Sequence, residues 1–372
     1  MPEHLSPELV ELRDRVAALA RNELIPVVED ESIDAGEQRR RVVAASRRAG
    51  VFQLTQPEEF GGTRASTLAL TVARDTLGSF NLSHVPGIFG PGPGVLGGVG
   101  EPLKSEYLAP QMAGEKRGAF GFTEPDKAER STWGVLNGAT LTVNGQKSYV
   151  TGGADADFVN TLVEVDGQGP AMVVIDTAAP GVSIKHTFGS LDGTHHAYME
   201  FEDVEVPASH IIGKPGEGIP RALGQIGNTR LAFAAESVGL ARWVIDFVTE
   251  HIQAPHRSGQ PLGSREGVRM RYADMRIRAF AARSMVYRTA RLADAGENII
   301  NEGIASKVFA TEMIADVVDT GIQLVGGIAL RTGHPLEALY RRVRTLRLAE
   351  GASDILRINL AKGRLELDKG RI

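Results

Sequence analysis

The first third of the chain carries apolar residues at helical spacing. Ser6 precedes a run whose proline and glutamate suit the first turn of a helix, so it is a candidate N-cap. One face of that helix collects four apolar residues, Leu9, Leu12, Val16 and Leu19. Residues 36–49 and 67–75 repeat the pattern, and the turn-rich residues 57–62 lie between them. The pattern predicts a helical block that ends near residue 117.

From about residue 118 the apolar period changes to two, as in β-strands. The dipeptide Asn144-Gly145 follows two alternating apolar residues and is the strongest short signal for a hairpin turn. A second hairpin is predicted around residues 166–169, because apolar runs flank this Gly-containing segment. Residues 197–206 alternate like a half-buried strand. We therefore expect a small β-domain.

Beyond Pro220 the sequence is rich in Ala, Leu and Arg and has few helix breakers. It predicts four long helices, at residues 219–252, 264–295, 298–325 and 352–366. Four long helices with short connections favour an antiparallel bundle. Helices, then strands, then helices, without βαβ units, argue against a doubly wound fold and predict an α+β multidomain chain. We expect three domains, at residues 1–117, 118–215 and 216–372.

Composition excludes several kinds of chemistry. The 372 residues are 42% hydrophobic and 23% charged, as in ordinary globular proteins, and they include no cysteine. Disulfides, thiolate nucleophiles and cysteine-bound metals are therefore excluded. No apolar run approaches the roughly 20 residues of a membrane helix. The N-terminal residues lack the basic start and apolar core of a secretory signal. We expect a cytoplasmic protein that is not inserted into a membrane.

The charge balance argues against nucleic acid as a partner. Net charge is −5, whereas contacts to phosphates require a basic surface. The local exception is a group of four arginines, Arg341, Arg342, Arg344 and Arg347. A helix surface that faces solvent or another subunit explains these arginines better than DNA does.

One glycine motif suggests nucleotide binding and is best rejected. Gly92, Gly94 and Gly97 match G-x-G-x-x-G, which binds a pyrophosphate only between a strand and a helix. Here Pro93 interrupts the motif, and helical or loop sequence flanks it. We interpret it as an interdomain turn.

Four short strings carry the candidate chemistry: residues 121–125 (GFTEP), 149–151 (YVT), 323–327 (QLVGG) and 350–354 (EGASD). Each has an ordinary interpretation by itself. The first is a plausible strand end, and the glycines of the third suit the C-cap of a helix. Glu350 could be an exposed glutamate before a helix that Ser353 caps.

Taken together and in this order, these strings resemble the acyl-CoA dehydrogenase family. The resemblance covers nearly the whole chain, because further motifs match at residues 54–62, 107–110, 273–275 and 339–341. It implies an N-terminal α-helical domain, a β-barrel-like middle domain and a C-terminal four-helix bundle. It also implies FAD between the last two domains, no metal, and an acyl-CoA or other acyl thioester as substrate. Homotetramers and an electron-transfer flavoprotein or similar acceptor are typical of the family.

The family reaction desaturates an acyl thioester between its α and β carbons. A carboxylate takes the α proton while a hydride leaves the β carbon for flavin N5, and Glu350 holds the position of that carboxylate. Burial would raise the pKa of such a base toward neutrality. Gly351 would leave room for the thioester, and Arg230 would lie close by or form a buried ion pair. The position that supplies the base in a minority of members is Thr229 here, which has no carboxylate.

The resemblance also implies the residues that contact FAD. Phe122 and Thr123 would bond to the pyrimidine part of the isoalloxazine, Thr151 would reach its N5 side, and Tyr149 would pack near its edge. Contacts to the adenosine diphosphate portion, from the neighbouring subunit, would come from Gln323, Gly326 and Gly327. Arg257 is the arginine nearest to a position that clamps FAD across the dimer.

Several departures fall on FAD contacts. The Gly-rich loop that usually follows Thr-Glu-Pro is replaced by residues 126–131, and the cross-dimer arginine position is Pro255, with Arg257 displaced by two residues. The sequence therefore leaves three hypotheses: an active desaturase, a flavin oxidase or monooxygenase, and an FAD-poor or inactive subunit that supports a paralogue in a hetero-oligomer. It does not define the length of the acyl group, its branching, or its carrier.

Overall fold

The computed structural model of the protein describes residues 4–367 and residue 372, and the chain forms two compact units. Unit 1 holds the chain up to Thr55, then Thr63–Gly90 and the chain from Gly227 onward. Unit 2 holds Gln56–Gly62 and Pro91–Ile226. Each unit has its own apolar core, so each is described separately. The division into three domains stays a prediction.

The N-terminal helices of unit 1 are those that the apolar pattern predicts: α1 (Pro7–Leu19), α3 (Ala35–Arg48) and α4 (Thr67–Gly78). Between α1 and α3 lies the short helix α2 (Ile25–Val28). Ser66 caps α4, because its side chain accepts a hydrogen bond from the main-chain N–H of Ala69 at 3.2 Å. Ser6 is the N-cap residue of α1, as predicted, although its side chain makes no capping hydrogen bond.

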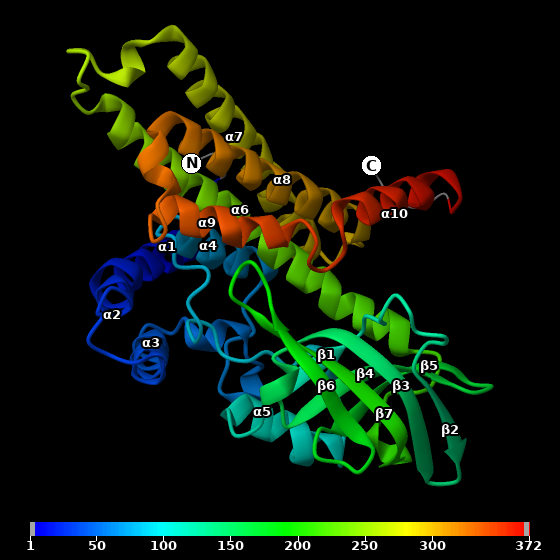
Figure 1. Ribbon diagram of the computed structural model, residues 1–372. Helices are drawn as coiled ribbons and strands as arrows, with labels where there is room; N and C mark the ends of the chain where they lie inside the picture. The colour runs from blue at the N-terminus through cyan, green and yellow to red at the C-terminus, as the bar shows by residue number, and fades with distance from the viewer. Residues whose placement is uncertain (1–3, 368–371) are drawn as a thin grey trace. The chain divides into compact units, whose positions relative to one another are not determined.

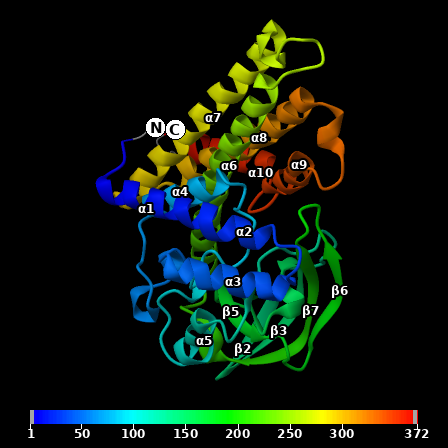
Figure 2. The ribbon, with the colours of Figure 1, turned by 90° about the vertical axis from the view of Figure 1, so that its left-hand side faces the viewer.

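The C-terminal helices form the larger core of unit 1. The four predicted helices are present as α6 (Gly218–Gln253), α7 (Glu266–Asp294), α8 (Ile300–Val325) and α10 (Ser353–Leu365). A further helix, α9 (Pro335–Leu346), packs on α8 and was missing from the predicted elements. Figures 1 and 2 show α6, α7 and α8 side by side. Their facing sides contribute Val244, Ala282 and Ile314, all fully buried.

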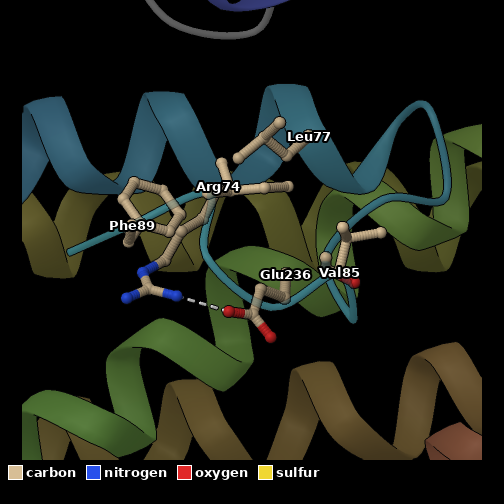
Figure 3. Close-up of a pocket in the computed structure, with 7 residues that line it drawn as sticks. Arg74, Leu77, Val85, Phe89 and Glu236 are labelled. Carbon is tan, nitrogen blue, oxygen red and sulfur yellow. Dashed lines mark hydrogen bonds and ion pairs between the residues drawn. The ribbon is translucent and has the colours of Figure 1, made fainter. Parts of the chain in front are cut away.

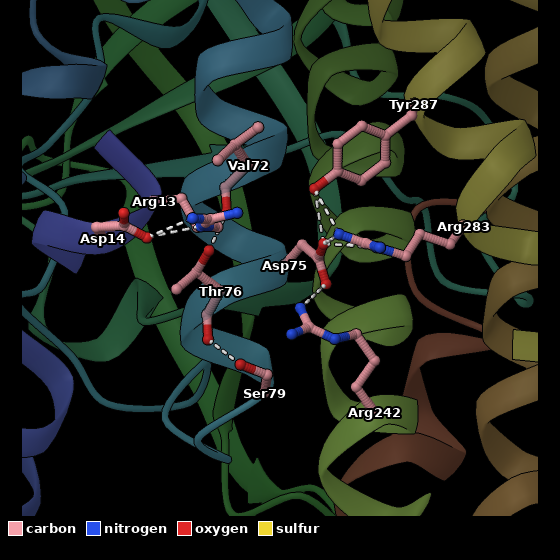
Figure 4. Close-up of polar contacts among 9 residues, drawn as sticks. All are labelled: Arg13, Asp14, Val72, Asp75, Thr76, Ser79, Arg242, Arg283 and Tyr287. Atoms are coloured by element: carbon pink, nitrogen blue, oxygen red, sulfur yellow. Dashed lines mark hydrogen bonds and ion pairs between the residues drawn. The ribbon is translucent and has the colours of Figure 1, made fainter. Parts of the chain in front are cut away.

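A buried carboxylate joins three of these helices. Asp75 on α4 is 1% exposed and accepts hydrogen bonds from Arg242 (3.0 Å), Arg283 (2.8 Å) and the hydroxyl of Tyr287 (2.6 Å). Figure 4 shows these side chains converging on Asp75 from α6 and α7. Burial is the main reason that the pKa of Tyr287 is raised, so its hydroxyl remains a donor at neutral pH. The cluster ties α4 to α6 and α7.

Unit 2 is built on one eight-stranded sheet. Its strands are β1 (Gly118–Gly121), β2 (Trp133–Asn137), β3 (Thr140–Thr151), β4 (Phe158–Val165), β5 (Gly169–Asp176), β6 (Val182–Gly189), β7 (His195–Pro207) and β8 (Ile211–Ile212). They pair in the order β6-β7-β3-β2-β4-β5-β8, and β1 pairs with β4. The order begins at β6 and ends at the two-residue β8, so the sheet is not closed and the barrel-like expectation holds only loosely. A short helix, α5 (Ala109–Ala113), precedes the sheet.

The predicted hairpin at Asn144-Gly145 is wrong. Both residues lie inside β3, where the pairing with β7 shifts register between Val143 and Gly145. The Asn144 side chain accepts a hydrogen bond from the N–H of Asp203 at 2.9 Å and donates one to its carboxylate at 3.0 Å. The Asn-Gly pair therefore forms a β-bulge that is fixed by a distant strand. The hairpin predicted around residues 166–169 is confirmed, because β4 and β5 pair antiparallel across it.

Three further sequence features can be compared with the structure, and only the interpretation of Arg342 is wrong. The G-x-G-x-x-G segment contains only the short 3-10 turn Gly94–Leu96, and the first strand, β1, comes after it, so it lacks the strand–helix context of a nucleotide site. Arg342 is not a surface arginine: it is partly buried, and burial lowers its pKa to about 10. No helix in the described ranges is long and apolar enough to span a bilayer.

Candidate active site

Glu350 lies in the short connection between α9 and α10, where the backbone is unusual. Glu350 has φ +55° and Gly351 has φ +105°, two consecutive residues in a region that side chains disfavour. A Cβ on Gly351 would lie 3.0 Å from the Leu356 side chain and 3.3 Å from Nη2 of Arg230. Glycine is therefore required at position 351 for both its backbone and its space.

Two cationic side chains hold this connection, the partly buried Arg230 and the fully buried Lys307. Nε of Arg230, on α6, donates a hydrogen bond of 2.8 Å to the carbonyl oxygen of Glu350. Nζ of Lys307, on α8, donates one of 2.8 Å to the carbonyl oxygen of Gly351. Arg230 thus binds the main chain of Glu350, in addition to acting on its carboxylate through charge. Hydrogen bonds from two helices therefore offset the strain of the positive-φ backbone at residues 350 and 351.

The same groups set the protonation of Glu350. Burial raises the pKa of its carboxyl, and the charges of Arg230 and Lys307 oppose that rise. Burial also lowers the pKa of Lys307 to about 8, helped by repulsion from Arg230. At pH 7 Lys307 is still mainly protonated, so two positive charges face the carboxylate. The site combines a partly dehydrated carboxylate with two positive charges that oppose the rise of its pKa.

Lys307 is the residue that the sequence interpretation missed. Its side chain is fully buried on α8, a helix of mainly apolar residues. Burying a lysine on the apolar face of a helix costs free energy unless the charge has a partner. Its position on that face was therefore a sign in the sequence that Lys307 has a specific partner. Four charged neighbours shift the pKa of Lys307. They are Arg230 on α6, Glu312 on α8, and Arg347 and Glu350 in the connection after α9.

Replacing Lys307 by methionine should shift the pH dependence of proton removal. The Lys307 charge lowers the pKa of Glu350, so its loss should raise that pKa and move the acidic limb of the rate to higher pH. The measurement is the rate of substrate-driven flavin bleaching from pH 5 to pH 9. Lys362→Met, on exposed α10, is the matched control and should leave the limb in place. An unmoved limb in Lys307→Met would contradict this role.

The residues predicted to contact the adenosine diphosphate portion lie elsewhere in unit 1. Gln323 is exposed near the end of α8, and Gly326 and Gly327 follow the helix with open space where side chains would be. Sixteen residues separate Gln323 from Lys307, about 24 Å along the helix axis. Arg257 is exposed in the connection between α6 and α7. Gln323 is thus far along α8 from the Glu350 connection of its own chain.

The first pair of predicted flavin contacts lies directly after β1 in unit 2. Thr123 is exposed, and its carbonyl accepts a hydrogen bond from the N–H of Ser148 at 2.9 Å. Buried Lys147 donates to the carbonyl of Phe122 at 3.3 Å and forms an ion pair with Glu124. Lys147 thus fixes the backbone around Thr123 from inside the sheet.

The second pair lies at the end of β3. Tyr149 has φ +54° and is 63% exposed, which is unusual for a large aromatic residue. Its ring packs edge-to-face on Phe188 with centroids 5.1 Å apart, and it also contacts His196. The hydroxyl of Thr151 lies 3.1 Å from Nδ1 of His196. The end of β3 therefore carries an exposed aromatic surface.

Comparison with known proteins decides the family. The description "Acyl-CoA dehydrogenase, N-terminal domain" matches residues 6–115, and "Acyl-CoA dehydrogenase, C-terminal domain" matches residues 216–365, together more than half of the chain. The chain belongs to the acyl-CoA dehydrogenase family.

Similar proteins match over nearly their whole length. An acyl-CoA dehydrogenase of Bacillus subtilis is 26% identical, covering 96% of this chain and 98% of that protein. The short-chain specific acyl-CoA dehydrogenase of Clostridium acetobutylicum is 28% identical over 95% and 97%. Among solved structures, one described as the electron transferring flavoprotein of Acidaminococcus fermentans has a TM-score of 0.84 at 25% identity, over 98% and 100%.

As an acyl-CoA dehydrogenase family member, the chain is an FAD-dependent oxidoreductase acting on CH–CH groups. Its own residues fit a planar cofactor. Tyr149 and Thr151, on β3, and Thr123, directly after β1, are all exposed residues. Gly326 and Gly327 have no protein atom where a Cβ would lie, which leaves space for a close ligand.

Proposed function

We propose that the protein desaturates an acyl thioester between its α and β carbons, with Glu350 as the base that removes the α proton. The observation that carries this proposal is the Glu350 connection, whose left-handed backbone is held by Arg230 and Lys307. Backbone strain and a raised carboxyl pKa concentrate at functional sites.

The chain's residues supply the acid–base part of this reaction. A carbon acid is weak, so the base needs a raised pKa, and burial gives Glu350 such a shift. The main-chain N–H of Glu350 is the protein donor that would stabilise charge on the thioester oxygen. Arg230 supports this role because it fixes the carbonyl of the same residue. The α proton ends on the Glu350 carboxylate.

FAD, when bound, would supply the acceptor for the hydride that leaves the β carbon. We propose that Phe122, Thr123, Tyr149 and Thr151 hold its ring system, and that Gln323, Gly326, Gly327 and Arg257 contact its adenosine diphosphate portion from a neighbouring subunit. The exposure of Gln323, Gly327 and Arg257 supports a contact with a second chain. A homotetramer, a cytoplasmic location and an electron-transfer flavoprotein as acceptor remain parts of this proposal.

The test is anaerobic flavin bleaching with a panel of acyl-CoA thioesters. We expect purified protein to be yellow and at least one thioester to bleach it while an enoyl thioester forms. A yellow protein that no thioester bleaches, even with an added paralogue, would contradict the proposal. The altered residues 126–131 and Pro255 motivate the hypothesis of a supporting subunit. Purified protein that lacks flavin, and binds it only after a paralogous chain is added, would favour that hypothesis.

A further inference from the structure

Lys147, on β3, is a charged residue inside the apolar sheet of unit 2. Its side chain is fully buried and passes close to Gly121, where a Cβ would lie 3.3 Å from Cγ of the lysine. Its ammonium donates a hydrogen bond of 3.3 Å to the carbonyl oxygen of Phe122 and forms an ion pair with Glu124. Burying an ammonium costs free energy even when it is paired, so packing alone does not explain a lysine at this position.

Another ion pair, in unit 1, shows what is different about Lys147. Arg74 on α4 pairs with Glu236 on α6, and Figure 3 shows the two charged ends pointing toward one another. Arg74 also lies over the Phe89 ring, 4.6 Å from its centroid. These contacts join side chains, as expected of a pair that holds two helices together. Lys147 also binds a main-chain carbonyl, at the peptide that joins Phe122 to Thr123.

The irregular end of β3 holds a second carbonyl of the same segment. The pairing of β3 with β7 shifts register between Lys147 and Val150. Such bulges redirect the groups of a strand and are common beside functional sites. Here the N–H of Ser148 donates a hydrogen bond of 2.9 Å to the Thr123 carbonyl. Two consecutive residues of β3 therefore hold the carbonyls of Phe122 and Thr123.

Glu124 keeps Lys147 charged and fixes the segment that follows. Its carboxylate accepts a hydrogen bond of 3.1 Å from the N–H of Thr132 and lies 3.1 Å from the Thr132 hydroxyl. Thr132 is itself buried. Burial lowers the pKa of Lys147, whereas the hydrogen bond and the charge of Glu124 raise it. The carboxylate therefore favours the protonated lysine.

The Lys147 charge can act on a ligand through one peptide group. The Phe122 carbonyl that accepts the ammonium and the N–H of Thr123 belong to the same peptide. Hydrogen bonds in a chain polarise one another, so the ammonium makes this N–H a stronger donor. Reduction of a flavin places negative charge on the pyrimidine part of its ring. A donor aimed at charge that develops there stabilises the reduced ring more than the oxidised ring.

We propose that Lys147 positions the peptide between Phe122 and Thr123 for the flavin and raises the flavin reduction potential through its buried charge. The inference rests on the proposed contact of this segment with the pyrimidine part of FAD. Lys147 is a positioning residue, because it acts through the peptide that it binds. Its role differs from that of Glu350, which takes the proton. Lys147 instead sets how readily the flavin accepts the hydride.

The experiment measures two properties of the full-length protein without substrate: the affinity of the apoprotein for FAD and the reduction potential of the bound flavin. Lys147→Met should weaken FAD binding by at least about tenfold, since charge-assisted hydrogen bonds are the strong polar contacts. The affinity for reduced FAD should fall by about a further tenfold relative to that for oxidised FAD. This difference appears as a more negative reduction potential.

Three further variants separate the charge of Lys147 from the structure around it. Glu124→Gln retains the lysine on the Phe122 carbonyl, so the potential should not become more negative. The double variant of Lys147→Met with Glu124→Gln removes both charges and leaves none unpaired, so it should fold and show the negative shift of Lys147→Met. Arg74→Met breaks the pair in unit 1 and should change neither FAD affinity nor potential.

The outcomes distinguish this inference from the proposed function. A wild-type potential in folded Lys147→Met or in the double variant would overturn the inference, even if thioesters bleach the wild-type flavin. An equal negative shift in Glu124→Gln or Arg74→Met would also overturn it, because general structure would then explain the effect. The expected shifts in a protein that no thioester bleaches would support this inference and contradict the proposed function. Wild-type protein that binds no added FAD would overturn both.

Discussion

Replacing Glu350 by glutamine is expected to slow acyl-CoA-driven bleaching of the flavin by about 10²–10⁴-fold, the usual contribution of a positioned base. Glutamine has nearly the shape of glutamate but cannot take a proton from carbon. The hydrogen bond from Arg230 goes to the main-chain carbonyl of residue 350, so the substitution leaves that contact intact. The flavin content and the oxidised flavin spectrum should therefore remain those of wild type.

The measurement is stopped-flow absorbance of the flavin under anaerobic conditions with a saturating thioester. Glu366→Gln, an exposed glutamate at the end of α10, is the matched control and should bleach at the wild-type rate. Bleaching of the Glu350→Gln protein at the wild-type rate would show that another group removes the proton. Loss of flavin from that variant would instead indicate a structural role for the carboxylate.

Removing the charge of Asp75 is expected to cause the largest loss of stability. Asp75→Asn leaves Arg283 and Tyr287 buried without their anionic partner, and removal of one partner of a buried pair costs roughly 3–5 kcal/mol. The cluster joins α4 to α6 and α7, so unit 1 should unfold at lower denaturant concentration (Figure 4). Asp75 has no proposed part in the reaction or in flavin binding, so the protein that remains folded should still contain flavin.

Urea unfolding followed by circular dichroism measures this effect. The control is Asp316→Asn, whose ion pair with Arg278 is exposed on both sides. Exposed pairs contribute about 0–1 kcal/mol, so the control should shift the midpoint little. Equal midpoints for Asp75→Asn and wild type would mean that the buried cluster is energetically neutral.

The helices and the presence of a β-domain were largely predictable because local signals coincide with the tertiary structure. The apolar face of α1 and the turn between β4 and β5 are examples, and both follow from short segments. Asn144-Gly145 failed because Asp203, 59 residues later, decides its conformation. The hairpin rule considers only residues close in sequence and so does not include Asp203. α9 is short and rich in arginine, so its apolar residues were too few for the pattern to stand out.

The candidate site was predictable only in part. The order of motifs along the chain indicated Glu350, whereas the groups around it come from distant segments. Arg230 lies 120 residues from Glu350 in sequence, and Lys307 lies 44 residues from Gly351. No spacing rule connects residues at such separations. Arg342 was interpreted as a surface charge because it stands among three other arginines. The sequence does not show that its side chain is partly buried.

Exchange of the α hydrogen with solvent tests the proposed base most directly. A saturated acyl-CoA is incubated anaerobically with the protein in deuterated water, and mass spectrometry follows deuterium at the α carbon. We expect incorporation by wild type and a rate lower by about 10²-fold or more in Glu350→Gln, because the carboxylate carries the proton. Equal incorporation by both proteins would contradict the assignment of Glu350.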